Sequence, residues 1–193
     1  MTSSTPEGLM YKIVLCVDVI NRVASRLTGI NQGVFEPVSL EKPKFDPPEL
    51  GFLRSVSWLF VLYQEVGYIG VVFLEDRLSA YGHDPSGRLS THRKLVQQMR
   101  TFSQHNLDPL KGHDRLTQDI CEHWLEEQCG TRVPGTDDQW RMCLLALFSE
   151  AVHFLQAILE TTRSIEQDES REQICREWVF RTKGYHPPHA FDE

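Results

Sequence analysis

Apolar residues recur every three or four positions along most of this chain, the spacing that gathers them on one face of an α-helix. One such run covers residues 10–27 and ends near Gly29, and another, strongly periodic, covers residues 138–165. Almost no segment alternates apolar and polar residues with the period of two that is typical of strands. The pattern therefore predicts an all-α protein.

Further helices are predicted over residues 49–81, 90–107, 114–127 and 170–182. The helix at 49–81 is almost entirely apolar, so it needs other helices or a partner chain around it to stay in solution. We expect an up-and-down bundle of four main helices, those at 49–81, 90–107, 114–127 and 138–165, with an additional N-terminal helix and a short C-terminal helix.

Prolines mark the one linker that the sequence predicts, because proline removes a backbone donor and disfavours helix in the residue before it. They are Pro37, Pro43, Pro47 and Pro48. The expected division is an N-terminal helix and proline-rich connector over residues 1–48, a helical bundle over 49–182 and a C-terminal tail over 183–193.

The chain is acidic, with 20 Lys and Arg against 27 Asp and Glu and a net charge of −7. Such a chain repels nucleic acid except where a local basic patch attracts it. Its five cysteines are odd in number and scattered, with no C-x-x-C pair, so neither a disulfide framework nor a zinc site is indicated. We expect reduced thiols in a cytoplasmic protein.

The start of the chain lacks the pattern of a secretory signal peptide. Residues 56–74 are almost long enough to span a bilayer, but Gln64 and Glu65 lie at the centre of this run. A charge at that depth is costly, which favours a buried core helix and no contact with a membrane.

Residues 85–107 form the one long stretch without Asp or Glu, and they contain Arg100 and His105. Arginine carries a permanent charge in a fork that matches phosphate oxygens, and histidine exchanges a proton near neutral pH. The pair predicts a site for an anionic substrate, and the simpler alternative is a solvated basic helix face. The other residues expected to bind substrate are Arg88, Arg93, Lys94 and Asn106.

A helical bundle that carries Arg100-Thr-Phe-Ser-Gln-His105 at a helix end resembles the HEPN superfamily over roughly residues 50–165. The resemblance implies a metal-independent RNA endonuclease of a toxin or antiviral defence system, a homodimer with a shared cleft, and no cofactor. It also implies RNA as substrate and an antitoxin or defence-system protein as a partner. His105 would transfer the proton of the 2′-hydroxyl, and Arg100 would stabilise the charged phosphorane.

Five residues advance a helix by about 140°, so two copies across a two-fold axis would supply the pair jointly. Two other pairs have a similar spacing. Arg77 and His83 lie among acidic residues, and Arg181 and His186 lie near the C-terminus beside two prolines. Neither context suits phosphate binding.

Two alternatives remain open. Thr101 stands where HEPN enzymes often have Asn, Asp or His, which leaves a non-catalytic interaction subunit as one alternative. The other is an HD-type metal phosphohydrolase, since histidine and aspartate suit a divalent metal. It would use His113 and Asp114 with His92 or His105 and a later carboxylate, Asp137 or Asp168.

Glu65 is an unusual charge because it lies midway along the apolar helix. A buried carboxylate is costly unless it is paired. We expect Glu65 either to meet an arginine of a neighbouring helix, such as Arg100, or to lie at a cleft as a supporting carboxylate.

Overall fold

The computed structural model describes residues 5–29, 33–105, 107–108 and 110–183. These residues form helices and no strand, which confirms the all-α class. The α-helices are α1 (Pro6–Thr28), α2 (Pro48–Phe60), α3 (Tyr68–Glu75), α4 (His92–Gln104), α5 (Gly112–Cys129), α6 (Asp137–Gln167) and α7 (Arg171–Lys183). A π-helix, η1 (Val61–Glu65), continues α2, and a 3-10 turn, η2 (Leu89–Thr91), precedes α4.

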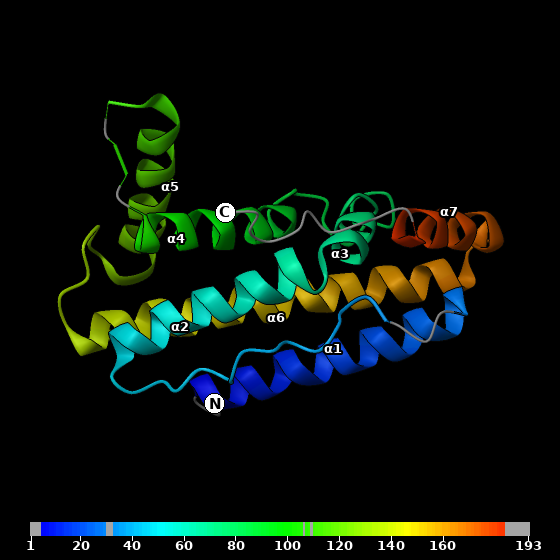
Figure 1. Cartoon of the computed structure of the whole chain (residues 1–193), viewed down its shortest axis with the longest axis horizontal. Helices are drawn as coiled ribbons and strands as arrows, with labels where there is room; N and C mark the ends of the chain where they lie inside the picture. Colours follow the sequence, from blue (N-terminus) through cyan, green and yellow to red (C-terminus); the bar gives the residue numbers. More distant parts are fainter. Residues whose placement is uncertain (1–4, 30–32, 106, 109, 184–193) are drawn as a thin grey trace, which may run out of the picture.

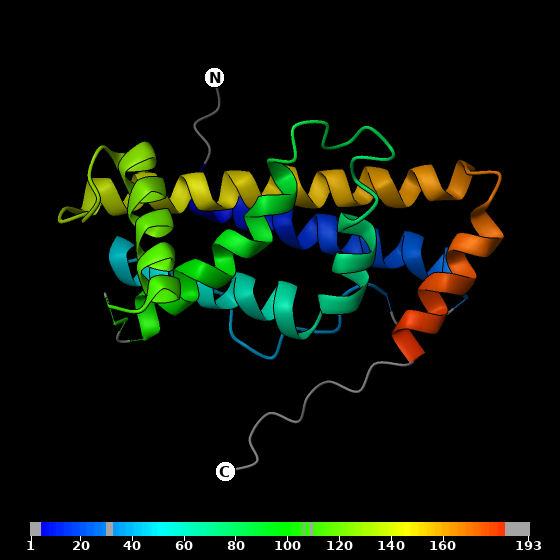
Figure 2. The same cartoon turned by 90° about the horizontal axis from the view of Figure 1, so that it is seen from above.

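Helix α6 is the spine of the molecule. Thr136 and Gln139 form a capping box at its start, in which each side chain bonds to the backbone of the other residue. Its buried apolar residues belong to a single core cluster with those of α1 to α5 and α7. Helix α1 lies along α6, and α2 lies on another side of it (Figures 1 and 2).

The up-and-down order of four main helices is not confirmed. After α1 the chain runs back alongside that helix to the start of α2, so that α1, α2 and α6 point in the same direction (Figure 1). Helix α5 stands steeply to this axis, and after the end of α6 the chain turns back into α7 (Figures 1 and 2). The segment between α1 and α2, residues 33–47, is called the connector below.

Asn21 of α1 fixes the connector. Its amide donates to the carbonyl of Phe35 and accepts from the N–H of Phe35, each at 2.9 Å. The N–H of Glu36 donates to the carbonyl of Val66 at 2.9 Å. These bonds hold Phe35 against the helices, where its side chain is buried.

The predicted helix over 49–81 is wrong as a single helix. It is broken at residues 66–67, where the axis turns by 80° between the segment ending at Glu65 and α3. A Cβ added at Gly67 would lie 2.4 Å from the ring of Phe35, and one at Gly70 would lie 2.8 Å from the side chain of Val34. The connector therefore occupies space that only glycine leaves free, and the helix bends around it.

The apolar residues of this run are mostly buried within the chain, as a core helix requires. By length and composition alone, α6 could cross a membrane, and so could the α2–α3 pair if it is counted as one span. In the most apolar 18-residue stretch of α6, 61% is buried inside the protein. Burial of this kind is typical of a core helix.

A buried ion pair links the bent segment to α4. The Nε of Arg93 lies 2.6 Å from a carboxylate oxygen of Glu75 on α3, and the two side chains are only 11% and 9% exposed. Arg93 also donates to the amide oxygen of Gln64 in η1 at 3.2 Å. The position of α4 thus depends on the bend that brings Glu75 toward it.

We predict that Glu75→Gln lowers the free energy of unfolding by about 3 kcal/mol, because it leaves the charge of Arg93 buried without its partner. Urea denaturation followed by circular dichroism measures the change. The matched control is Glu172→Gln, since Glu172 and Arg176 lie 4.0 Å apart with side chains 83% and 76% exposed. The control should change stability by less than about 0.5 kcal/mol, and equal losses in the two variants would contradict the role of the buried pair.

Candidate functional site

Arg100 and His105 both lie at the C-terminal end of α4, as the motif predicts. The guanidinium carbon of Arg100 lies 4.1 Å from the centre of the Phe60 ring on α2. His105 is exposed directly after the last helical residue, and its N–H donates to the carbonyl of Thr101 at 3.0 Å. No hydrogen bond or ion pair joins the two side chains within the described chain, so one copy does not assemble them into a pair.

Arg93 was expected to bind substrate, and the structure places it in the interior instead. Its ion pair with Glu75 and its bond to Gln64 occupy the guanidinium inside the protein, so it is not free to meet a substrate. Arg88 and Lys94 are exposed as expected. Asn106 lies outside the described residues.

Glu65 lacks the arginine partner that was one of its two expected positions. The expectation of a buried carboxylate assumed a continuous apolar helix, but the π-helix ends at Glu65 and leaves this side chain exposed to solvent. Arg100, the expected partner, lies over the ring of Phe60 and forms no ion pair with Glu65 in the described structure. Of the two expected positions, the arginine partner is not found, but Glu65 does lie at a cleft, because it lines a pocket of about 240 Å³ with Tyr68 and Trp178. A supporting role for this carboxylate stays a prediction.

A polar seam joins the acid-free face of α4 to α2 and η1. Gln97 lies 3.4 Å from Gln64, and the amide of Gln104 donates to the hydroxyl of Ser57 at 2.8 Å. Arg93 and Arg100 lie three or four residues from Gln97 and Gln104, on the same face of α4, so they belong to this seam as well. The seam accounts for much of the basic and polar character of residues 93–104 and fixes the end of α4 over α2.

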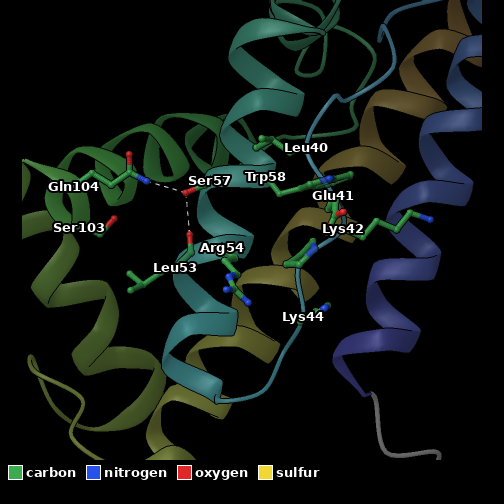
Figure 3. Close-up of a pocket in the computed structure, with 11 residues that line it drawn as sticks. Leu40, Glu41, Lys42, Lys44, Leu53, Arg54, Ser57, Trp58, Ser103 and Gln104 are labelled. Atoms are coloured by element: carbon green, nitrogen blue, oxygen red, sulfur yellow. Dashed lines mark hydrogen bonds between the residues drawn. The ribbon is translucent and has the colours of Figure 1, made fainter.

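An open pocket of about 480 Å³ lies beside that end of α4 (Figure 3). Its walls come from three segments: the connector, α2 and the last turn of α4. The lining residues are Leu40, Glu41, Lys42, Pro43, Lys44, Leu53, Arg54, Ser57, Trp58, Ser103 and Gln104. Three of them are cations and one is an acid, so the pocket is locally basic in an acidic chain.

The sequence did not reveal this pocket. Lys44 and Arg54 lie in a segment that also contains Asp46 and Glu49, so no run of basic residues marks them. They line one pocket with Ser103 and Gln104 only because the connector, α2 and the end of α4 meet there. A weak signal was the pair of lysines on either side of Pro43.

The structure does not assemble the ligands of the HD-type alternative. The described residues include no group of three His, Cys, Asp or Glu side chains placed to share a metal ion. His113 lies 3.4 Å from Thr117, and Asp114 accepts from the N–H of Asp108 at 3.0 Å. Both therefore have local partners at the start of α5.

Asp168, another carboxylate of that alternative, accepts from the hydroxyl of Tyr81 at 2.7 Å. Burial, together with this hydrogen bond, raises the pKa of Tyr81 to about 12. The hydroxyls of Ser170 and Tyr81 lower the pKa of Asp168. The pair ties the loop after α3 to the end of α6, which is a structural role.

His92 belongs to a buried polar cluster at the start of α4. Its Nδ1 lies 3.3 Å from a carboxylate oxygen of Glu150, and the indole N–H of Trp124 donates to the same carboxylate at 3.0 Å. The Nε2 of His92 and the hydroxyl of Tyr63 are buried without a hydrogen-bond partner in the described structure. The cluster links α4, α5 and α6 and does not reach the pocket beside His105.

Comparison of the chain with protein families, with curated proteins and with solved structures finds no match. The interpretation of the site therefore depends on the geometry and charges described above.

Asp84 provides a test of how the acid-free stretch is positioned. Its side chain is 1% exposed and accepts from the N–H of Ser90 at 2.8 Å and from the hydroxyl of Ser86 at 3.4 Å. Burial alone would raise the pKa of Asp84, but hydrogen bonds from Ser90, Leu89 and Ser86 lower it overall. The carboxylate thus fixes the turn that precedes α4.

We predict that Asp84→Asn destabilises the protein by about 1 kcal/mol at pH 7, because charge-assisted hydrogen bonds to the turn are weakened. The folded pKa lies below the unfolded value of about 3.9, so this stability is present above pH 4 and is lost as the pH falls further. Urea denaturation at pH 7 and pH 3 should show the gap between wild type and variant narrowing at pH 3. A gap of constant size would contradict the prediction, and the exposed Asp138→Asn serves as control.

Proposed function

We propose that the protein is a metal-independent RNA endonuclease of a toxin or antiviral defence system, acting in the cytoplasm as a dimer related to HEPN proteins. The observation that carries the proposal is the basic pocket beside the end of α4, where His105 is exposed. It supplies positive charge for a polyanion next to a group that exchanges protons near neutral pH. The relation to HEPN proteins and to their helical bundle belongs to the same proposal.

The chemistry assigns one role to each residue of the pair. His105 takes the proton of a ribose 2′-hydroxyl, and the 2′-oxygen attacks the adjacent phosphorus. The bond to the 5′-oxygen breaks, that oxygen takes the proton that His105 has accepted, and the products carry a 2′,3′-cyclic phosphate and a 5′-hydroxyl. Arg100 stabilises the phosphorane, since the contact with Phe60 leaves its N–H donors without a carboxylate partner among the described residues and able to bind phosphate oxygens.

A dimer is favoured because Arg100 and His105 point in different directions on one chain. The apolar run at residues 56–74 does not support a dimer. That run is mostly buried within one chain, so surplus hydrophobic surface does not argue for a second copy. On α4, Arg100 leans toward α2 while His105 leaves the end of the helix. A second copy would bring the histidine of one chain to the arginine of the other.

A second candidate is a non-catalytic interaction subunit. The stacking of Arg100 on Phe60 favours it, because that contact alone explains an arginine at this position. Tyr11 and Leu15, one turn apart on α1, are also exposed, at 69% and 46%. Exposed apolar side chains of this kind suit contact with another protein.

We predict that His105→Ala and Arg100→Ala each lower RNA cleavage by a factor of about 10² or more without loss of helical content, because proton transfer and electrostatic stabilisation each contribute on that scale. Gel analysis of a labelled RNA measures the rate and identifies the cyclic phosphate ends. His153→Ala, which changes an exposed histidine of α6, is the matched control and should leave the rate unchanged. Chelator should have no effect, and DNA should not be cleaved.

Undiminished cleavage by the His105→Ala protein would sink the assignment of this pair. Cleavage abolished by chelator would shift the interpretation to metal-dependent chemistry. Absence of cleavage by the folded wild type would favour the interaction subunit.

We further predict a dimer at micromolar concentration, with twice the monomer mass of 22.3 kDa. Analytical ultracentrifugation measures the mass, and mixing the two inactive variants tests the shared site. A hybrid of Arg100→Ala and His105→Ala chains contains one intact site of two, so an equal mixture should recover about a quarter of the activity. A pure monomer, or a mixture as inactive as its components, would contradict the shared site.

A further inference from the structure

We infer that the pocket between the connector, α2 and α4 binds the phosphate backbone of single-stranded RNA and leads it to His105. This inference rests on the proposed function and adds a binding site to it. The site is formed by residues that lie outside the Arg100 and His105 motif. Its main contacts to phosphate are Lys44 and Arg54, with Gln104 at the end nearest to His105.

The cations that line this pocket have no carboxylate partner in the part of the chain that the structure describes. Many arginines elsewhere in the described chain are paired with carboxylates, as Arg26 is with Glu166 at 2.7 Å and Arg77 with Glu177 at 2.8 Å, although Arg88 and Arg100 are not. Within the described residues, no carboxylate lies within ion-pair distance of Lys42, Lys44 or Arg54, all of which line the pocket. A chain with a surplus of acids thus leaves three cations unpaired around one hollow, which attracts an anion.

The side chains of Lys44 and Arg54 are placed to contact one phosphate. Lys44 and Arg54 lie on the same side of the pocket, one from the connector and one from α2 (Figure 3). Lys42 extends toward α1 and contributes at longer range. Two cations that line one pocket suit a phosphate, whose negative charge they neutralise.

The shape of the pocket favours a strand of nucleic acid over a compact ion. A volume of about 480 Å³ is within the range of sites that hold molecules larger than a phosphate. Leu40 and Leu53 give it apolar surface for sugars and bases. Gln104 donates to Ser57 and keeps its amide oxygen as an acceptor, which a ribose hydroxyl satisfies.

The position of the pocket connects it to the proposed chemistry. Ser103 and Gln104 line it, and His105 is the next residue of the chain. The Gln104–Ser57 bond holds this last turn of α4 against α2. A strand bound in the pocket therefore passes beside the histidine.

The test compares two variants of equal charge change. Lys44→Glu with Arg54→Glu reverses the pocket, and Lys12→Glu with Lys183→Glu reverses two exposed cations on α1 and α7 that do not line it. Fluorescence anisotropy measures binding of a labelled oligoribonucleotide to proteins that also carry His105→Ala, so that the 2′-hydroxyl is kept and the strand stays intact. Titrations at several salt concentrations give the number of phosphate contacts.

We predict that the pocket variant binds at least about tenfold more weakly, and that its salt slope falls by about 1.4 because two single-strand phosphate contacts are lost. The control variant should lose at most about threefold through its weaker long-range field. Circular dichroism and thermal melting check folding, and the neutral Lys44→Gln with Arg54→Gln should show the same loss of slope.

Equal weakening in the pocket and control variants, or a parent protein with the intact pocket that binds no oligonucleotide, would overturn the inference. Complete competition by millimolar adenosine monophosphate would also overturn it, since a small phosphate ligand would then be the natural occupant. Pocket-dependent binding without cleavage of natural RNA supports the inference and removes the proposed endonuclease activity. Cleavage of natural RNA by a pocket variant with normal affinity would leave the proposed function in place and overturn the inference.

Discussion

The contact of the connector with the bend between η1 and α3 determines the arrangement of the other helices. Phe35 and Val34 lie against Gly67 and Gly70, where a side chain would collide with them, and Asn21 fixes Phe35 through two backbone bonds. The resulting turn of 80° directs α3 toward α4, so that Glu75 meets Arg93. The same connector, continuing toward α2, supplies one wall of the basic pocket. One packing contact thus positions both the ion pair and the candidate site.

The local pattern of the sequence predicted most helices, because an apolar stripe with helical spacing marks a helix whatever the stripe packs against. The predicted ranges 138–165 and 170–182 agree with α6 and α7 to within two residues at each end. The break in the helix over 49–81 was not predictable in this way. Its apolar residues satisfy a helical spacing on both sides, and Phe35, which packs against the bend at Gly67, comes from a different part of the chain.

The candidate site shows the same division. The sequence placed Arg100 on α4 and His105 at its end, since a local motif and a helix boundary suffice for both. It could not choose between the two alternatives for Glu65, whose exposure at a pocket follows from the bend, and it failed for Arg93, whose partner Glu75 is brought close only by tertiary structure. It also missed Lys44 and Arg54, because two cations in an acidic segment become a site only when the connector and α2 meet beside α4.

The distribution of charge explains why a local basic site can persist in a chain with a net charge of −7. Many acids are held by arginines on other faces, so their fields are partly neutralised where they lie. Lys44 and Arg54 have no such partner in the described structure, and two like charges that line one pocket repel each other, which costs stability in the absence of an anion. An anion bound between them removes that repulsion and stabilises the folded state by mass action. Because the Gln104–Ser57 bond joins the same wall to the end of α4, binding there also stabilises the position of the turn that carries His105.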